Sequence, residues 1–182
     1  MLSSPVWRGT PVLAFCVGLV AGGMLTATVV VVAGTLVRVP FPEPVRWALV
    51  AAVLLAVALK EAGVVSYRLP ENRRLVPESV FRLGRHLGPL QFGVEMGSGA
   101  RTYLPSGLPY VAAVAVLLLA PVPAALCAGV GFGLGRTLMT TSHRRYGSGT
   151  GWDAEWLRYR RPLRLMLGAA FTVSLVAAVA AG

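Results

Sequence analysis

The residues best suited to chemistry are an acidic and a basic side chain, Glu95 and Arg101, set in the moderately apolar stretch His86–Gly107. An ionisable group at membrane depth is costly and usually faces a cavity or a partner. The two residues would not share a face of a continuous helix, but a break at Gly97-Ser98-Gly99 would let them meet. They would then form a gate, or a site for a proton or an anion. The polar neighbours that would line this substrate or gating site are Ser98, Thr102 and Tyr103. In the alternative interpretation, both charges are solvated at the membrane interface or form a structural pair.

Residue types that serve redox, metal or hydrolytic chemistry do not gather in the sequence. Neither Cys16 nor Cys127 belongs to a C-x-x-C pair. They are expected at opposite depths of the membrane, which argues against a disulfide, since the Cα atoms must come within about 7 Å. His86 and His143 have no second ligand at zinc spacing, and no hydrolase motif is present. We therefore expect no metal, no cofactor and no catalytic residue, and the sequence leans away from an enzyme.

The composition indicates a membrane protein. Of 182 residues, 55% are hydrophobic and 13% are charged, and the mean hydropathy is +0.69. A soluble domain carries about 25% charged residues, so the sequence excludes both a single water-soluble domain and a disordered chain. Lys60 is the only lysine among 17 basic residues. Together with abundant Ala, Gly and Val, this usage is typical of a GC-rich bacterial genome.

Apolar segments of about 20 residues can cross a bilayer as helices. The candidates are Pro11–Val37, Val45–Val65, Leu108–Ala120, Ala124–Met139 and Leu163–Ala181. The third is short by itself. The stretch His86–Gly107 either forms the first half of a broken third span or lies flat at the cytoplasmic interface, and we favour the broken helix. The sequence thus predicts an all-α polytopic membrane helix bundle of four or five transmembrane helices, a single integral membrane domain over 1–182.

Basic residues in short loops set the orientation, because cytoplasmic loops carry an excess of Lys and Arg. Residues 60–86 and 136–163 hold most of them and are predicted to be cytoplasmic loops, and Arg8 places the N-terminus on the same side. We expect a multi-pass protein of the bacterial cytoplasmic (inner) membrane. These loops account for the formal net charge of +10 through contact with anionic lipid, so no nucleic-acid partner is expected.

Glycines spaced four residues apart predict close helix packing. The pairs are Gly18 with Gly22, Gly93 with Gly97, Gly129 with Gly133, and Gly131 with Gly135. A shift of the chain by 77 residues also places Phe15 on Phe92 and Gly22 on Gly99. This match indicates either a tandem two-helix repeat or a coincidence in a chain rich in Ala, Val, Leu and Gly.

Short helices interrupted by Gly and Pro, two similar halves and a span ending in Gly-Phe-Gly-Leu-Gly-Arg136 resemble the CcdA/DsbD-type transmembrane family over about 12–139. Members pass reducing equivalents across the bacterial inner membrane through paired intramembrane cysteines. The resemblance implies a similar architecture. Cys16 would align with Gly93 and Cys127 with Val50, so the family's cysteine pair is not matched and no active residue is carried over.

Two functions fit these observations. A small transporter-like protein would move a small solute or reducing equivalents past Glu95 and Arg101. A non-catalytic subunit or assembly factor of a larger membrane complex would use the glycine faces and the basic loops. The expected partners are the lipid bilayer and either a second copy of the chain or other membrane subunits.

Overall fold

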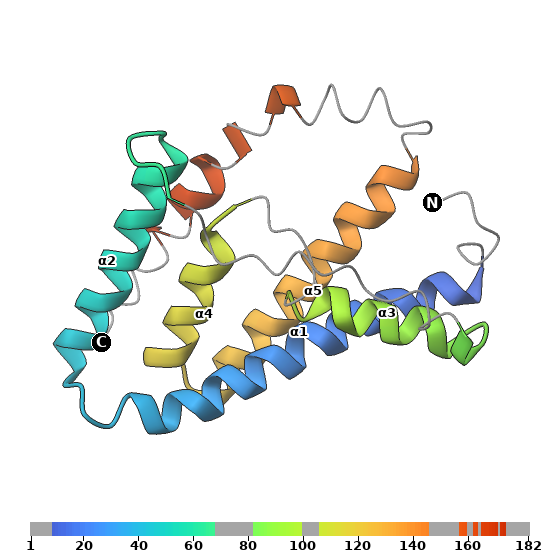
Figure 1. Cartoon of the computed structure of the whole chain (residues 1–182), viewed down its shortest axis with the longest axis horizontal. Helices are drawn as coiled ribbons and strands as arrows, with labels where there is room; N and C mark the ends of the chain where they lie inside the picture. The colour runs from blue at the N-terminus through green and yellow to red at the C-terminus, as the bar shows by residue number, and fades with distance from the viewer. Residues whose placement is uncertain are drawn as a thin grey trace.

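The computed structural model describes residues 9–67, 82–99 and 106–145, with side chains up to residue 141, and the short pieces 157–159, 162–163, 165–170 and 172–173. Its elements are α1 (Thr10–Val37), α2 (Glu43–Glu61), α3 (Leu87–Gly97), α4 (Leu108–Leu118) and α5 (Val122–Arg145) (Figure 1). The described pieces after residue 156 are helical as well. The described chain is all-α, which confirms the predicted fold class at that level.

Helix α1 follows the predicted first span closely. It begins after Gly9, whose φ of 79° is not helical. Pro11 lies in the first turn, where its fixed φ favours helix and the backbone N–H that proline lacks would have no intrahelical partner. No charged residue occurs within Thr10–Val37, and Arg38 follows as the cap. An uninterrupted apolar run with a breaker at its start therefore defines this helix.

The stretch His86–Gly107 is helical at first, and its helix ends at the expected glycine break. Helix α3 starts after Gly84, with φ of 95°, and is followed by Gly99, with φ of 73°. An L-residue side chain disfavours both conformations, so glycine sets both limits. Residues 100–105 lie outside the described chain, and α4 covers most of the segment predicted as Leu108–Ala120.

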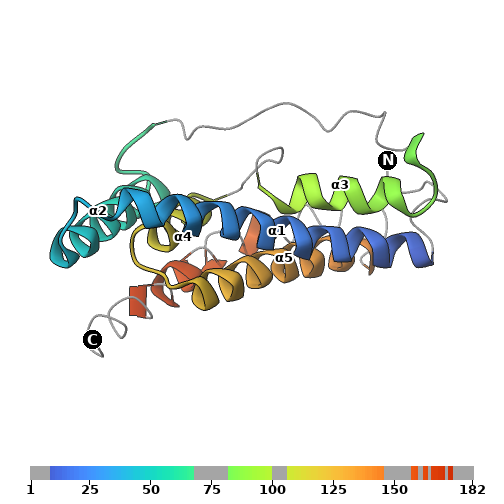
Figure 2. The same ribbon diagram turned by 90° about the horizontal axis from the view of Figure 1, so that it is seen from below.

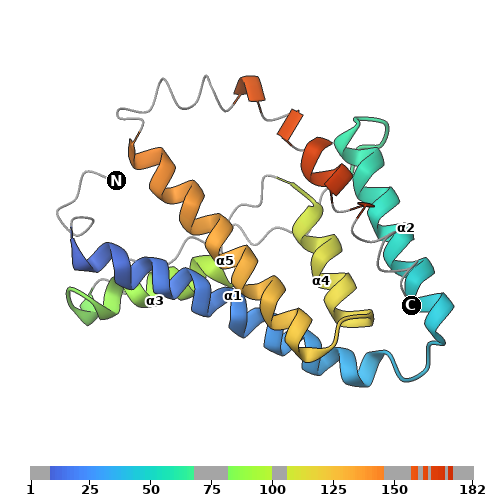
Figure 3. The ribbon, with the colours of Figure 1, turned by 180° about the vertical axis from the view of Figure 1, so that it is seen from behind.

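Helix α1 lies between α3 and α5, as Figure 2 shows. Helix α3 runs parallel to α1, because Thr10 contacts His86 and Thr26 contacts Ser98. Helix α5 runs in the opposite direction, because Ala125 packs with Val31 whereas Gly133 lies beside Val20. Helices α2 and α4 pack together near the C-terminal end of α1 (Figure 3). The two halves of the sequence are thus arranged differently, since α5 packs against α1 and α2 against α4.

The core is thin and the apolar surface is extensive. One buried cluster holds Phe15 and Leu19, and a second holds Val31, Val116 and Ala125. Large apolar side chains remain exposed along the length of α1: Leu13, Val17, Leu25, Val29, Val32 and Leu36. None of the buried side chains in the described chain is polar or charged. A soluble monomer rarely exposes so continuous an apolar surface.

Two described helices are long and apolar enough to cross a membrane, Thr10–Val37 and Val122–Thr141. Helix α2 carries charges at both ends, and α4 has 11 residues. The predicted fifth span, Leu163–Ala181, lies largely outside the described residues.

Two helices end at different residues from the predicted spans, although the apolar part of α5, Val122–Thr141, lies close to the predicted Ala124–Met139. Helix α2 ends at Glu61 rather than Val65, close to Gly63 with its φ of 80°. Helix α5 continues past Met139 to Arg145, so the predicted loop 136–163 begins as helix. Falling hydropathy marks the end of an apolar segment, but Thr and Arg are compatible with continued helix.

Candidate functional site at the end of α3

Glycines on both helices bring α3 against α1. A Cβ at Gly18 would overlap the carbonyl oxygen of Leu90, and a Cβ at Gly93 would overlap that of Phe15. One turn further on, Gly22 and Gly97 meet in the same way. The rings of Phe15 and Phe92 stack beside them with centroids 5.7 Å apart. Contact between the two backbones therefore fixes the position along α1 at which α3 ends.

Helix α3 ends beside the middle of α1, in a small polar cluster. The hydroxyl of Thr26 donates to the carbonyl oxygen of Ser98 at 3.1 Å. The hydroxyl of Ser98 donates to the carbonyl oxygen of Glu95 at 2.7 Å. These bonds satisfy two backbone oxygens that a helix end leaves without intrahelical partners. Thr26 thus anchors the end of α3 to α1.

The acidic group of this cluster is Glu95, which is half-buried on α3. Its Oε1 lies 3.4 Å from Nε2 of Gln91, one turn earlier. Helix α5 contributes Phe132, whose ring would lie 3.6 Å from a Cβ at Gly99. The guanidinium of Arg136 sits over that ring, 5.9 Å from its centroid, which is a cation–π distance. Side chains of three helices therefore meet where α3 ends.

The predicted site residues are only partly placed. Glu95 and Ser98 lie together on α3. Arg101, Thr102 and Tyr103 lie outside the described residues, so the meeting of Glu95 with Arg101 stays a prediction. Sequence reasoning missed Thr26, Phe132 and Arg136. A polar residue in the longest apolar run was the available signal for Thr26, whereas Arg136 was assigned to a loop.

The glycines of α5 divide into two faces. Gly129 and Gly133 lie against α1, where a Cβ on either would overlap the backbone of Gly23 or Val20. A Cβ at Gly131 or Gly135 would meet no atom of the described residues within 4 Å. One face therefore packs against α1, while the other faces away from the described helices.

Neither cysteine forms a disulfide. Cys16 belongs to α1, and Cys127 on α5 packs at a different level along α1. Cys16 packs against the cluster of Phe15 and Leu19. Cys127 is exposed and lies between Ala125 and Gly129, whose neighbours on α1 are Val31 and Ala27. At about 1.5 Å per residue, the two thiols are separated by roughly three turns of α1.

Neither ligand geometry nor similarity identifies a chemistry for this site. Within the described residues, no group of three or more His, Cys, Asp or Glu side chains is placed to hold a metal ion. No protein-family model matches the chain, and neither a curated protein nor a solved structure matches it.

Proposed function

We propose that this chain is a small multi-spanning membrane protein that moves a small polar solute past the end of α3. The first support is the surface of the helices. Leu13, Val17 and Leu36 on α1 are 66%, 60% and 76% exposed. Contact of such apolar side chains with lipid tails carries no free-energy penalty, whereas their contact with water does. The bundle of four or five spans predicted from the sequence is part of this proposal.

The observation that carries the proposal is the place where α3 ends. Thr26, which binds the last turn of α3, lies within one turn of the midpoint of Thr10–Val37. If α1 crosses the bilayer, α3 is a half-helix that ends near the membrane midplane. Irregular backbone at that depth is tolerated only where protein or a water-filled cavity satisfies it. Discontinuous helices that end near the midplane form the substrate sites of many transporters.

Charge at this helix end supports the same function. Glu95 lies on the last turns of α3, and Arg136 is held over Phe132 on the neighbouring α5. Ionisable groups at membrane depth mark pathways for ions, protons or substrates. With Arg101, Thr102 and Tyr103 next in the chain, the site would accept a proton or a small anion.

The proposed orientation places the N-terminus in the cytoplasm of a bacterial cell, with the protein in its cytoplasmic membrane. Thr10 Oγ1 and His86 Nε2 are 3.0 Å apart, so α1 and α3 start at the same end of the bundle. Figure 1 shows that α5 ends on that side as well. Three basic segments of the sequence are attached to these helix ends, and positive loops remain in the cytoplasm.

The resemblance to the CcdA/DsbD-type family belongs to this proposal as a matter of architecture. Transfer of reducing equivalents would require two thiols that reach each other or a common partner. Cys16 and Cys127 lie at different levels of α1, so the proposal favours a solute over reducing equivalents.

Reconstitution tests the proposed site. Purified protein would be placed in liposomes loaded with pyranine, and proton uptake would be recorded under a pH gradient and after addition of acetate, lactate or phosphate. We expect flux that falls at least about tenfold in E95Q and in R101A. The control is E43Q, which removes an acid at the start of α2, far from α3. Equal flux in all variants would remove the site from the proposal.

A second candidate, a non-catalytic subunit or assembly factor, is favoured by the open face of α5. Gly131 and Gly135 have free space around them, and Leu134 and Leu138 are 50% and 67% exposed. Small residues at this spacing let another helix approach closely. Purification in mild detergent from the native membrane tests this reading. Other subunits in a fixed ratio would favour it, whereas a monomer or homodimer would favour transport.

A further inference from the structure

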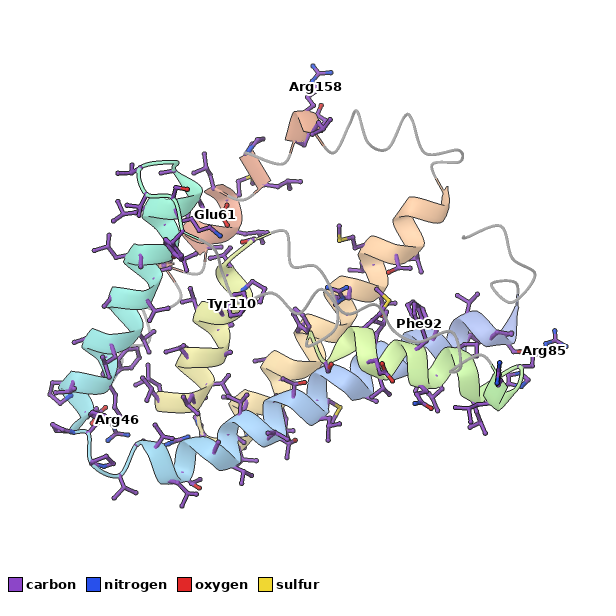
Figure 4. All side chains as sticks on the ribbon, in the orientation of Figure 1. Arg46, Glu61, Arg85, Phe92, Tyr110 and Arg158 are labelled. Carbon is purple, nitrogen blue, oxygen red and sulfur yellow. The ribbon has the colours of Figure 1, made fainter. Side chains whose placement is uncertain are left out.

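Helix α4, the second half of the broken span, meets a charge of opposite sign at each end. At its start, the backbone N–H of Gly107 donates to Oε1 of Glu61 at 2.9 Å. Figure 4 shows Glu61 at the end of α2, next to the start of α4. At the other end, Nη1 and Nη2 of Arg38 lie 3.3 Å from the carbonyl oxygen of Ala120. A helix carries partial positive charge at its start and partial negative charge at its end, so both charges stabilise α4.

Arg38 also ties α4 to α1. Its Nε donates to the carbonyl oxygen of Gly34 at 2.9 Å, while the rest of the guanidinium binds Ala120. One side chain therefore bridges the C-terminal ends of two helices, where cations are favourable. This role explains why the turn between α1 and α2 contains the basic residue Arg38, although the proposed orientation places this turn outside the cell.

The remaining attachment of α4 differs from that of α3 and α5. Helices α1, α3 and α5 are joined by glycines in backbone contact at several successive turns. Helix α4 meets α1 at one such glycine, Gly34. Its remaining contacts are with α1, where Val116 packs against Val31, and with α2. Three helices thus form a body joined by backbone contacts, whereas α4 is joined to this body by apolar side chains such as Val116 and by the contacts at its two ends.

Helix α4 is short and is set off from the rest of the chain by helix breakers. It has 11 residues, too few to cross a bilayer alone. Gly107 precedes it, and Pro121 and Pro123 separate it from the body of α5. Proline supplies no backbone N–H, so the hydrogen-bond ladder does not continue smoothly from α4 into α5.

We propose that Arg38 and Glu61 form a charge clamp that holds α4 in place, and that α4 is the movable half of the broken span. Loss of either charge frees one end of α4 while the body of α1, α3 and α5 stays closed. The gating role of this movement rests on the proposed transport function. The clamp itself does not, because it follows from the contacts at the ends of α4.

Hydrogen–deuterium exchange of the full-length protein in detergent micelles, read by mass spectrometry, tests the clamp. The variants are R38Q and E61Q. We expect amides of α4 to exchange at least about fivefold faster in each variant, while amides of α1 keep their wild-type rates. The conservative variants R38K and E61D should restore most of the protection, because they keep the charge.

Two neighbouring charges provide matched controls. R46Q alters the same end of the molecule, and Arg46 Nε has no hydrogen-bond partner among the described residues. K60Q alters the residue beside Glu61, and the ammonium of Lys60 lies over the ring of Tyr67 at 5.3 Å. Neither control should change exchange in α4.

Three results would overturn the clamp: unchanged exchange of α4 in both R38Q and E61Q, equal acceleration in the controls, or acceleration throughout α1. Flux is measured separately in the liposome assay. Faster exchange in α4 without any wild-type flux would leave the clamp standing and remove the transport proposal. Flux in the wild type, together with unchanged exchange of α4 in R38Q and E61Q, would remove the clamp and leave the transport proposal standing.

Discussion

Gly22 on α1 and Gly97 on α3 face each other with no side chain between their backbones. A Cβ at Gly22 would overlap the carbonyl oxygen of Val94, and a Cβ at Gly97 would overlap that of Leu19. Gly18 and Gly93 repeat this arrangement one turn earlier. Two parallel helices thus use the same small-residue spacing in a nearly symmetric contact. This contact places the end of α3 at the middle of α1.

The variant G22A is expected to destabilise the bundle by about 1–3 kcal/mol, the usual range for overpacking. The added methyl group would meet backbone atoms of α3, which do not rotate away as a flexible side chain does. G131A is the matched control, because a Cβ there meets nothing within 4 Å. Reversible unfolding in SDS, followed by circular dichroism, gives both free energies. Equal stability of the two variants would contradict the contact between α1 and α3.

Substitution on the open face of α5 should change association and leave folding intact. G135L places a large side chain where the described helices leave free space, and leucine has the higher helix propensity, so the unfolding free energy should not fall below that of wild type. If another helix packs there, the same variant loses that partner. Native mass spectrometry of protein purified from the source membrane would show the loss. G133L is the contrasting variant, since Gly133 contacts Val20 and its substitution should impair folding itself.

Oxidation with copper phenanthroline should give no disulfide within one molecule. Cys16 and Cys127 lie at levels of α1 separated by roughly three turns, well beyond the Cα separation that a disulfide allows. Mass spectrometry of the peptides reports the outcome. An intramolecular disulfide between Cys16 and Cys127 would contradict the antiparallel register of α1 and α5.

The helices that the sequence located best are those defined by uninterrupted apolar runs. α1 matches its prediction because neither a charge nor a proline occurs between Pro11 and Val37. The end of α5 was missed because hydropathy falls after Met139 whereas the helix continues to Arg145. Periodicity and composition report which residues avoid water, and they report the end of a helix only when a cap or a breaker coincides with it.

The candidate site was predictable only in part, for a related reason. Glu95 stood out as a charge in an apolar stretch, and Ser98 lay beside it at the glycine break. Thr26 and Phe132 join the site through the register between helices that are distant in sequence, which no local pattern reports. Contact between backbones, rather than likeness of side chains, sets this register.

The hydrogen bond from Thr26 to Ser98 can be removed almost without a change of shape. T26V keeps the branched side chain and loses the hydroxyl that donates to the Ser98 carbonyl oxygen at 3.1 Å. Interhelical hydrogen bonds in membranes average about 0.6 kcal/mol and reach about 1.7 kcal/mol, so we expect a loss of stability in that range. The control is T28V, because the hydroxyl of Thr28 binds Met24 within the same helix. SDS unfolding compares the two variants, and the liposome assay compares their flux. T26V should reduce both stability and flux relative to T28V, since the end of α3 is then held less firmly at the proposed site. Indistinguishable variants would mean that the polar contact at the middle of α1 neither anchors α3 nor shapes the pathway.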